Sequence, residues 1–81
     1  MTNKNKLYQL IADVFNIDIL DVNEQSNPES IENWDSFNGF VLLDDLETKF
    51  NVKFSLDEVT AVKNVGDIKQ HLQNHGVTFD E

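Results

Sequence analysis

Apolar residues recur at helical spacing in four short segments, and no segment alternates cleanly as a strand would. In the first segment, four apolar residues stand at i, i+3, i+4 and i+7 and so share one helical face. They are Leu7, Leu10, Ile11 and Val14. Residues 51–55 come closest to alternating, but they have no second strand to pair with. For 81 residues, this pattern predicts one all-α domain, a small four-helix bundle.

Signals at the helix ends set the expected bounds. Helices are expected over Asn3–Phe15, Ser36–Phe50, Leu56–Val62 and Val65–Asn74, the third being short. Ser55 and Glu58 form the S-x-x-E pattern of a capping box, and Asn64 suits an N-cap. Gly76 suits the left-handed residue after the last helix. We therefore expect a single domain over residues 1–76 and a frayed tail over residues 77–81.

Residues 16–34 form a long first loop of 19 residues with no convincing helix. Loops of this length are uncommon in compact domains and are usually functional or docked. Its apolar residues are expected to hold it against the bundle. These are Ile17, Ile19, Leu20, Val22, Ile31 and Trp34.

The net charge of −9 is unevenly distributed, because the ten acids between Leu7 and Thr48 are accompanied by no base. This asymmetry favours a surface for a basic partner, and a solvated face is the simpler alternative. Nucleic acid is an unfavourable partner for such a chain. No apolar run is long enough to span a membrane and no signal peptide is visible, so we expect a cytoplasmic protein. The absence of cysteine excludes disulfides, thiolate metal sites and a thiol nucleophile of its own.

The pair Asp35-Ser36 stands where the second helix is expected to begin. Asp35 is a good N-cap, which places Ser36 in the first turn. The Ser36 hydroxyl then lies near free backbone N–H groups and the positive end of the helix dipole. A phosphate ester on that oxygen would be well placed, although Asp-Ser also opens many ordinary helices.

Residues 33–50 resemble the acyl carrier protein family, which places an Asp-Ser-Leu-type motif at the start of its second helix. A Leu-Glu pair and a Phe follow that motif in the family, and here these are Leu46-Glu47 and Phe50. The run Asn64-Val65-Gly66-Asp67-Ile68 is similar to the start of the family's fourth helix. The resemblance covers nearly all of the chain, the long first loop included.

The resemblance implies that Ser36 is the attachment point of 4′-phosphopantetheine, with Asp35 as the helix cap beside it. A phosphopantetheinyl transferase would move the group from coenzyme A, using Mg²⁺. The missing cysteine fits, because the thiol would arrive with the cofactor. The chain would then be a stand-alone, monomeric and non-catalytic carrier of acyl or aminoacyl thioesters. It would present them to partner enzymes in a specialised or a fatty-acid or polyketide type of pathway.

Several positions of the second helix depart from the family's common pattern. Phe37 replaces the usual Leu, Val41 stands at an often acidic position, and Asp44 and Asp45 stand where apolar residues are frequent. These departures favour a specialised pathway. They also predict a docking face for enzymes with basic patches, with ordinary helix surface as the alternative. The predicted face comprises Phe37, Val41, Asp44, Asp45, Glu47 and Thr48.

Three other interpretations compete with the carrier. A plain acidic helical adaptor would keep the acidic face without modification of Ser36. The spacing Asp21-x-Asn23-x-Gln25 with Glu32 resembles a calcium loop, but Ser26 replaces the glycine of the sharp turn and Pro28 interrupts it. Finally, Asp67, His71 and His75 share one helical face, but a single helix cannot surround a metal ion, so no metal site is predicted.

Overall fold

The computed structural model describes residues 2–79, and these residues form helices without any strand. The helices are α1 (Asn3–Phe15), α2 (Ser36–Phe50), α3 (Leu56–Ala61) and α4 (Val65–Asn74), and a 3-10 turn, η1 (Ile19–Asp21), lies in the long first loop. The predicted all-α four-helix class is confirmed. The expected bounds hold, except that α3 ends one residue early because Val62 is already extended, with φ −70° and ψ 121°. None of these helices has the length and apolar character to cross a membrane.

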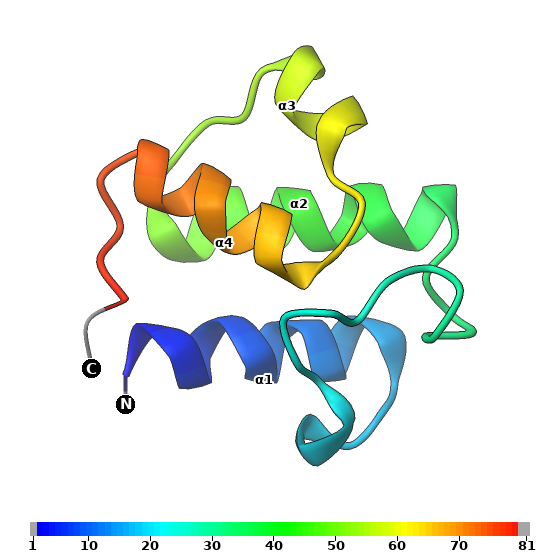
Figure 1. The fold of residues 1–81 in the computed structure, drawn as a ribbon. Helices are drawn as coiled ribbons and strands as arrows, with labels where there is room; N and C mark the ends of the chain where they lie inside the picture. Colours follow the sequence, from blue (N-terminus) through cyan, green and yellow to red (C-terminus); the bar gives the residue numbers. More distant parts are fainter. Residues whose placement is uncertain (1, 80–81) are drawn as a thin grey trace.

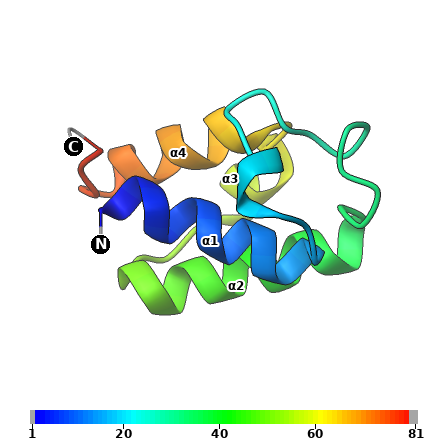
Figure 2. The same ribbon diagram turned by 90° about the horizontal axis from the view of Figure 1, so that it is seen from below.

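The three longer helices lie side by side, and the short α3 lies on the side of α2 and α4 that is away from α1 (Figure 1). α1 runs antiparallel to α2. In the view of Figure 2, α2 and α4 lie on opposite sides of α1. The long first loop covers the end of the bundle where α2 begins. This arrangement places the start of α2 close to both the loop and α3.

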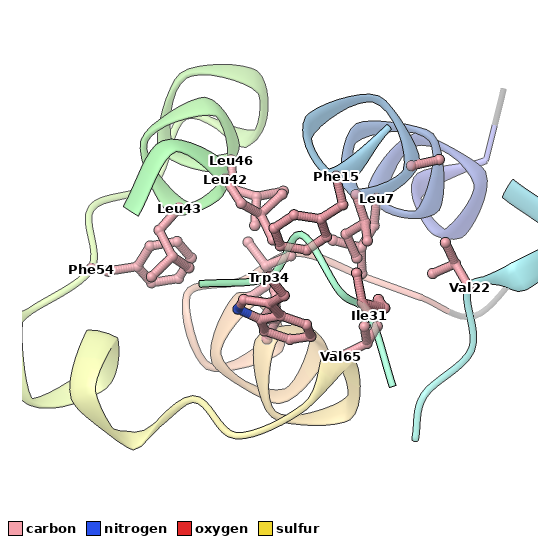
Figure 3. Close-up of a cluster of buried hydrophobic side chains, with 14 residues drawn as sticks. Leu7, Phe15, Val22, Ile31, Trp34, Leu42, Leu43, Leu46, Phe54 and Val65 are labelled. Atoms are coloured by element: carbon pink, nitrogen blue, oxygen red, sulfur yellow. The ribbon is translucent and has the colours of Figure 1, made fainter. Parts of the chain in front are cut away.

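The buried side chains form one cluster between the helices (Figure 3). On α1 the buried residues are Leu7, Ile11, Ala12 and Phe15, whereas Leu10 and Val14 of the predicted stripe are only partly buried. The inward face is therefore rotated toward Phe15. It is rotated because that ring packs against the long first loop as well as against α2.

The predicted caps are present at the described helix ends. At α3, Ser55 and Glu58 form a reciprocal capping box, with N···O distances of 2.9 and 3.2 Å. At α4, Asn64 Oδ1 accepts the N–H of Asp67 at 2.8 Å. Gly76 has φ of +95°, the left-handed conformation that glycine adopts without strain.

The long first loop is attached to the start of α4 through the backbone. The first two N–H groups of α4, those of Val65 and Gly66, donate to the carbonyls of Ser26 and Glu24, both at 2.9 Å. A Cβ on Gly66 would lie 3.3 Å from the Glu24 carbonyl oxygen, so glycine permits this close approach. The loop thus satisfies donors that a helix start otherwise leaves free.

Apolar residues of the loop also hold it, with one exception to the prediction. Val22, Ile31 and Trp34 are buried, and Ile17 and Ile19 are partly buried. Leu20 is 88% exposed, so the prediction that it packs inward is wrong. Its neighbour Ile19 faces the core within the η1 turn, which directs Leu20 outward.

The first three residues of the tail expected to be frayed contact the bundle. Asn3 Nδ2 donates to the carbonyl of Thr78 at 2.9 Å, and the rings of Phe50 and Phe79 lie 6.4 Å apart. The packed part of the chain therefore reaches Phe79. The last two residues of the predicted tail lie outside the described residues.

Candidate functional site

The Asp35-Ser36 pair begins α2 as predicted. Asp35 Oδ1 accepts the N–H of Asn38 at 2.8 Å, and its carbonyl accepts the N–H of Gly39 at 2.8 Å. Ser36 is the first residue of the helix and is exposed. Its hydroxyl makes no hydrogen bond to any residue from 2 to 79. The oxygen is therefore open to an enzyme that approaches from outside.

The positive end of α2 surrounds this hydroxyl. Within the described part of the chain, the backbone N–H groups of Ser36 and Phe37 have no acceptor. Free N–H groups and the helix dipole both favour an anion at such a position. A phosphate ester on the Ser36 oxygen therefore fits the local electrostatics.

The residues before Ser36 are held against α1. Trp34 stacks on Phe15 with ring centroids 5.1 Å apart, and Asn33 Nδ2 donates to the Phe15 carbonyl at 2.7 Å. Asn38 Nδ2 in turn donates to the Asn33 carbonyl at 2.8 Å. These contacts fix the direction in which the chain enters α2, and with it the place of Ser36.

A pocket of about 460 Å³ opens beside Ser36. It lies between α2, α3 and the second half of the long first loop, which leads into α2. Its lining is mostly apolar. The lining residues are Pro28, Trp34, Asp35, Ser36, Gly39, Phe40, Leu42, Leu43, Val59, Thr60, Val62 and Ile68. A chain attached to the Ser36 oxygen can therefore reach apolar surface without leaving the domain.

The predicted docking residues divide into two groups by exposure. Phe37, Asp44 and Thr48 are exposed, with Phe37 at 74%, whereas Val41 and Asp45 are half-buried. All five lie on the part of α2 that turns away from Leu42 and Leu46. They form a mixed acidic and apolar surface that begins next to Ser36.

Glu47, the sixth predicted docking residue, is bound within the fold. Its Oε2 accepts the backbone N–H of Phe54 at 2.7 Å. The contact fastens the segment between α2 and α3 to the last turns of α2. Glu47 therefore acts in the structure as an internal acceptor, which the sequence did not indicate.

Two exposed apolar side chains, one on α2 and one on α3, were not identified from the sequence. Phe40 is 57% exposed on α2, and Leu56 is 74% exposed at the first position of α3. The spacing of Phe37 and Phe40, at i and i+3, was the available signal for Phe40. The exposure of Leu56 depends on how α3 lies and has no local signal.

Glu58 connects α3 to the end of α4. Its carboxylate lies 2.8 Å from His75 Nε2 and 3.5 Å from His71 Nδ1. The pKa of Glu58 is lowered below 4.5, chiefly because the Ser55 backbone N–H donates to the carboxylate. The hydrogen bond and charge of His75 act in the same direction, while desolvation opposes them. This cluster fixes the helix that forms one wall of the pocket.

The residues of the two metal interpretations make other contacts. Asp67 Oδ2 accepts the N–H of Lys63 at 3.0 Å, and both His71 and His75 face Glu58 instead of Asp67. In the calcium interpretation, Asn23 Oδ1 accepts the N–H of Gln25 at 2.8 Å. Across residues 2–79, no group of three or more His, Asp or Glu side chains is arranged to hold a metal ion.

An exposed helix-start serine beside an apolar pocket, on a four-helix domain, fits a carrier type of protein. Residues 5–72 match the family model described as phosphopantetheine attachment site. The chain therefore belongs to this family, that of the acyl carrier proteins, and its cofactor is covalently attached 4′-phosphopantetheine. The comparison with curated proteins gave no match. Carrier domains of this family are in general non-catalytic and interact with a phosphopantetheinyl transferase and with acyl-handling enzymes.

Proposed function

We propose that this chain carries acyl or aminoacyl groups as thioesters on an arm attached to the Ser36 oxygen. The observation that carries the proposal is the exposed Ser36 hydroxyl, at the positive end of α2 and on the lining of the apolar pocket. When bound, the cofactor supplies the thiol that the chain itself lacks. The chain's own residues present the hydroxyl, favour the phosphate and offer apolar surface to the cargo.

Attachment is a phosphoryl transfer from coenzyme A. A bond forms between the Ser36 oxygen and the phosphorus that carries pantetheine, and the phosphoanhydride bond of coenzyme A breaks. The adenosine bisphosphate half of coenzyme A leaves, and the transferase accepts the hydroxyl proton. Because the Ser36 hydroxyl has no hydrogen-bonded base in residues 2–79, the base must come from the transferase.

The experiment is an intact-mass measurement after incubation with coenzyme A, Mg²⁺ and a broad-specificity phosphopantetheinyl transferase. We expect a gain of one phosphopantetheine in the wild type and in Ser30→Ala, an exposed serine of the long first loop. Ser36→Ala is expected to gain nothing. A wild type that stays unmodified beside a carrier modified in the same mixture would favour the adaptor. If Ser36→Ala also gains the mass of phosphopantetheine, the attachment point is a residue other than Ser36.

We further propose that the exposed α2 surface docks basic partner enzymes. Its support is the combination of Asp44 and Asp45 with the exposed Phe37 ring next to Ser36. The double variant Asp44→Lys, Asp45→Lys is expected to slow loading by the transferase, because it replaces attraction by repulsion. The matched control, Asp13→Lys with Glu29→Lys, makes the same charge change on acids outside α2. Equal loading rates for the two double variants would refute a specific docking role.

The departures from the common family pattern support a specialised pathway instead of general fatty-acid synthesis. Phe37 and Val41 make this surface more apolar beside Ser36, and Asp44 and Asp45 add charge further along α2. A partner enzyme would therefore need an apolar patch and a basic patch spaced along one helix. Loading assays compare transferases and acyl-activating enzymes of specialised pathways with those of fatty-acid synthesis. Preferential loading by the fatty-acid enzymes would contradict the assignment to a specialised pathway.

A further inference from the structure

The indole N–H of Trp34 is a hydrogen-bond donor without a partner. Trp34 is 8% exposed, and its ring is fixed by stacking on Phe15 at 5.1 Å. Its Nε1 atom makes no hydrogen bond to any residue in the described range. The indole nitrogen can only donate, so an acceptor must come from elsewhere. A donor that the protein does not pair, on a largely buried ring, is a place where an acceptor oxygen of water or of a ligand is bound.

The unpaired N–H lies at the pocket beside Ser36. Trp34, Ser36 and Gly39 all line this pocket, and a Cβ on Gly39 would lie 3.3 Å from Trp34 Nε1. Figure 3 shows the indole nitrogen on the edge of the ring that faces the side of Leu43, another lining residue. The absent side chain at Gly39 thus leaves the N–H accessible from the pocket.

The atom is not sealed inside the protein. Among the described residues, the one fully enclosed side-chain polar atom without a hydrogen-bond partner is His71 Nδ1. Trp34 Nε1 therefore keeps contact with space that a ligand can enter. The remaining polar side chain on the far wall, that of Thr60, already donates its hydroxyl to the carbonyls of Leu56 and Asp57, both at 3.1 Å. Apart from Ser36, the attachment residue itself, Trp34 is thus the lining residue in the described part of the chain whose side-chain donor is uncommitted.

We propose that Trp34 Nε1–H donates a hydrogen bond to a carbonyl oxygen of the group tethered at Ser36 when that group lies in the pocket. The inference rests on the proposed attachment at Ser36. Trp34 would then be a positioning and specificity residue, because an oxygenated group satisfies its N–H and a purely hydrocarbon group leaves it unpaired. The carbonyl belongs either to an amide of the arm or to the cargo, and the experiment separates these two sources.

The test uses the single tryptophan, which gives one indole cross-peak in a ¹⁵N–¹H spectrum. Four samples are compared with the unmodified chain: the holo form, the S-hexyl thioether form, the hexanoyl thioester form and the 3-oxohexanoyl thioester form. Each is made from the corresponding coenzyme A derivative, and each mass is recorded first. A missing mass gain would count against the proposed function, whereas a full mass gain with an unchanged indole resonance would count against this inference alone.

The four samples give distinct outcomes. A downfield indole shift already present in the holo form identifies an amide of the arm as the acceptor. A shift in the thioester forms but not in the holo and S-hexyl forms identifies a carbonyl of the cargo. The inference is overturned if no tethered form shifts the resonance. The inference is also overturned if the S-hexyl form shifts the indole resonance as far as the hexanoyl form does while the holo form leaves it unchanged. That result would show that filling the pocket, without a carbonyl, is enough to shift the resonance.

Two variants test the hydrogen bond itself. Trp34→Phe keeps an aromatic ring against Phe15 and removes the donor, and folding is verified by circular dichroism. The tethered form that shifts the indole resonance is prepared with ¹³C at its carbonyl carbon. The resonance of that carbon should lie further downfield in the wild type than in Trp34→Phe. Gly39→Ala retains the indole reporter but crowds its N–H, so the loading-induced indole shift should be reduced. Identical carbonyl resonances in the wild type and Trp34→Phe would refute the hydrogen bond.

Discussion

Replacing Glu47 by alanine separates an internal role of this acid from a docking role. Glu47 Oε2 accepts the Phe54 N–H at 2.7 Å, and Phe54 is a buried residue of the segment between α2 and α3. The variant leaves this part-buried N–H without its acceptor. Asp44→Ala is the matched control, because it removes the same charge from an exposed position of the same helix.

The expected loss follows from the kind of bond and its position. A hydrogen bond to a charged group contributes about 1.5–3 kcal/mol. Removing a negative charge near the C-terminal end of α2 returns about 0.3–1 kcal/mol through the helix dipole. The net loss of unfolding free energy for Glu47→Ala is therefore about 1–2 kcal/mol. In a domain of 81 residues this lowers Tm by about 4–16 °C, whereas Asp44→Ala should change stability by less than about 0.5 kcal/mol.

Urea unfolding, followed in parallel by Trp34 fluorescence and by circular dichroism, measures this difference. Coincident transitions from the two probes justify a two-state treatment. Glu47→Gln keeps a neutral acceptor and should fall between the wild type and Glu47→Ala. If Glu47→Ala and Asp44→Ala are equally stable, the bond to Phe54 contributes nothing, and the argument for an internal role of Glu47 is refuted.

Two further predictions concern the helix ends at the pocket. Asp35→Ala removes the acceptor of the Asn38 N–H and should cost about 1 kcal/mol in urea unfolding, whereas Asp35→Asn keeps the cap and should lie near the wild type; equal losses would contradict the cap. For Glu58, the folded-state pKa is lowered below 4.5, so its stabilisation is complete above about pH 4.5 and is lost as pH falls through the lowered value. The stability difference between the wild type and Glu58→Gln should therefore be largest well above pH 4.5 and shrink as the pH falls below 4.5, and a difference independent of pH would argue against this linkage.

The helix ends were predictable because their signals are local. Asp35 and Asn64 each accept an N–H three residues ahead, and Ser55 pairs with Glu58 over the same separation. Such contacts depend only on the helical geometry of one turn. Gly66 was also recognisable as part of a motif. The reason why a glycine is needed there, the close approach of the Glu24 carbonyl, appears only in the folded chain.

The inward faces were less predictable than the helices that carry them. Periodicity identifies which residues share a face, but it does not state what lies opposite that face. The stripe on α1 is rotated toward Phe15 because the long first loop packs there, and Leu20 is exposed because η1 turns Ile19 inward instead. Both outcomes depend on where a loop of 19 residues comes to rest.

By itself, the sequence determined the four helices, their caps and the placement of Ser36 at the first turn of α2, since each depends on neighbours within a few residues. It also carried the family motif that the comparison matched over residues 5–72. Only the tertiary structure decided that Glu47 binds Phe54, that α3 closes a pocket beside Ser36 and that Trp34 presents a free N–H to it. The physical reason is that these features join segments separated along the chain, and their geometry is set by the packing of whole helices.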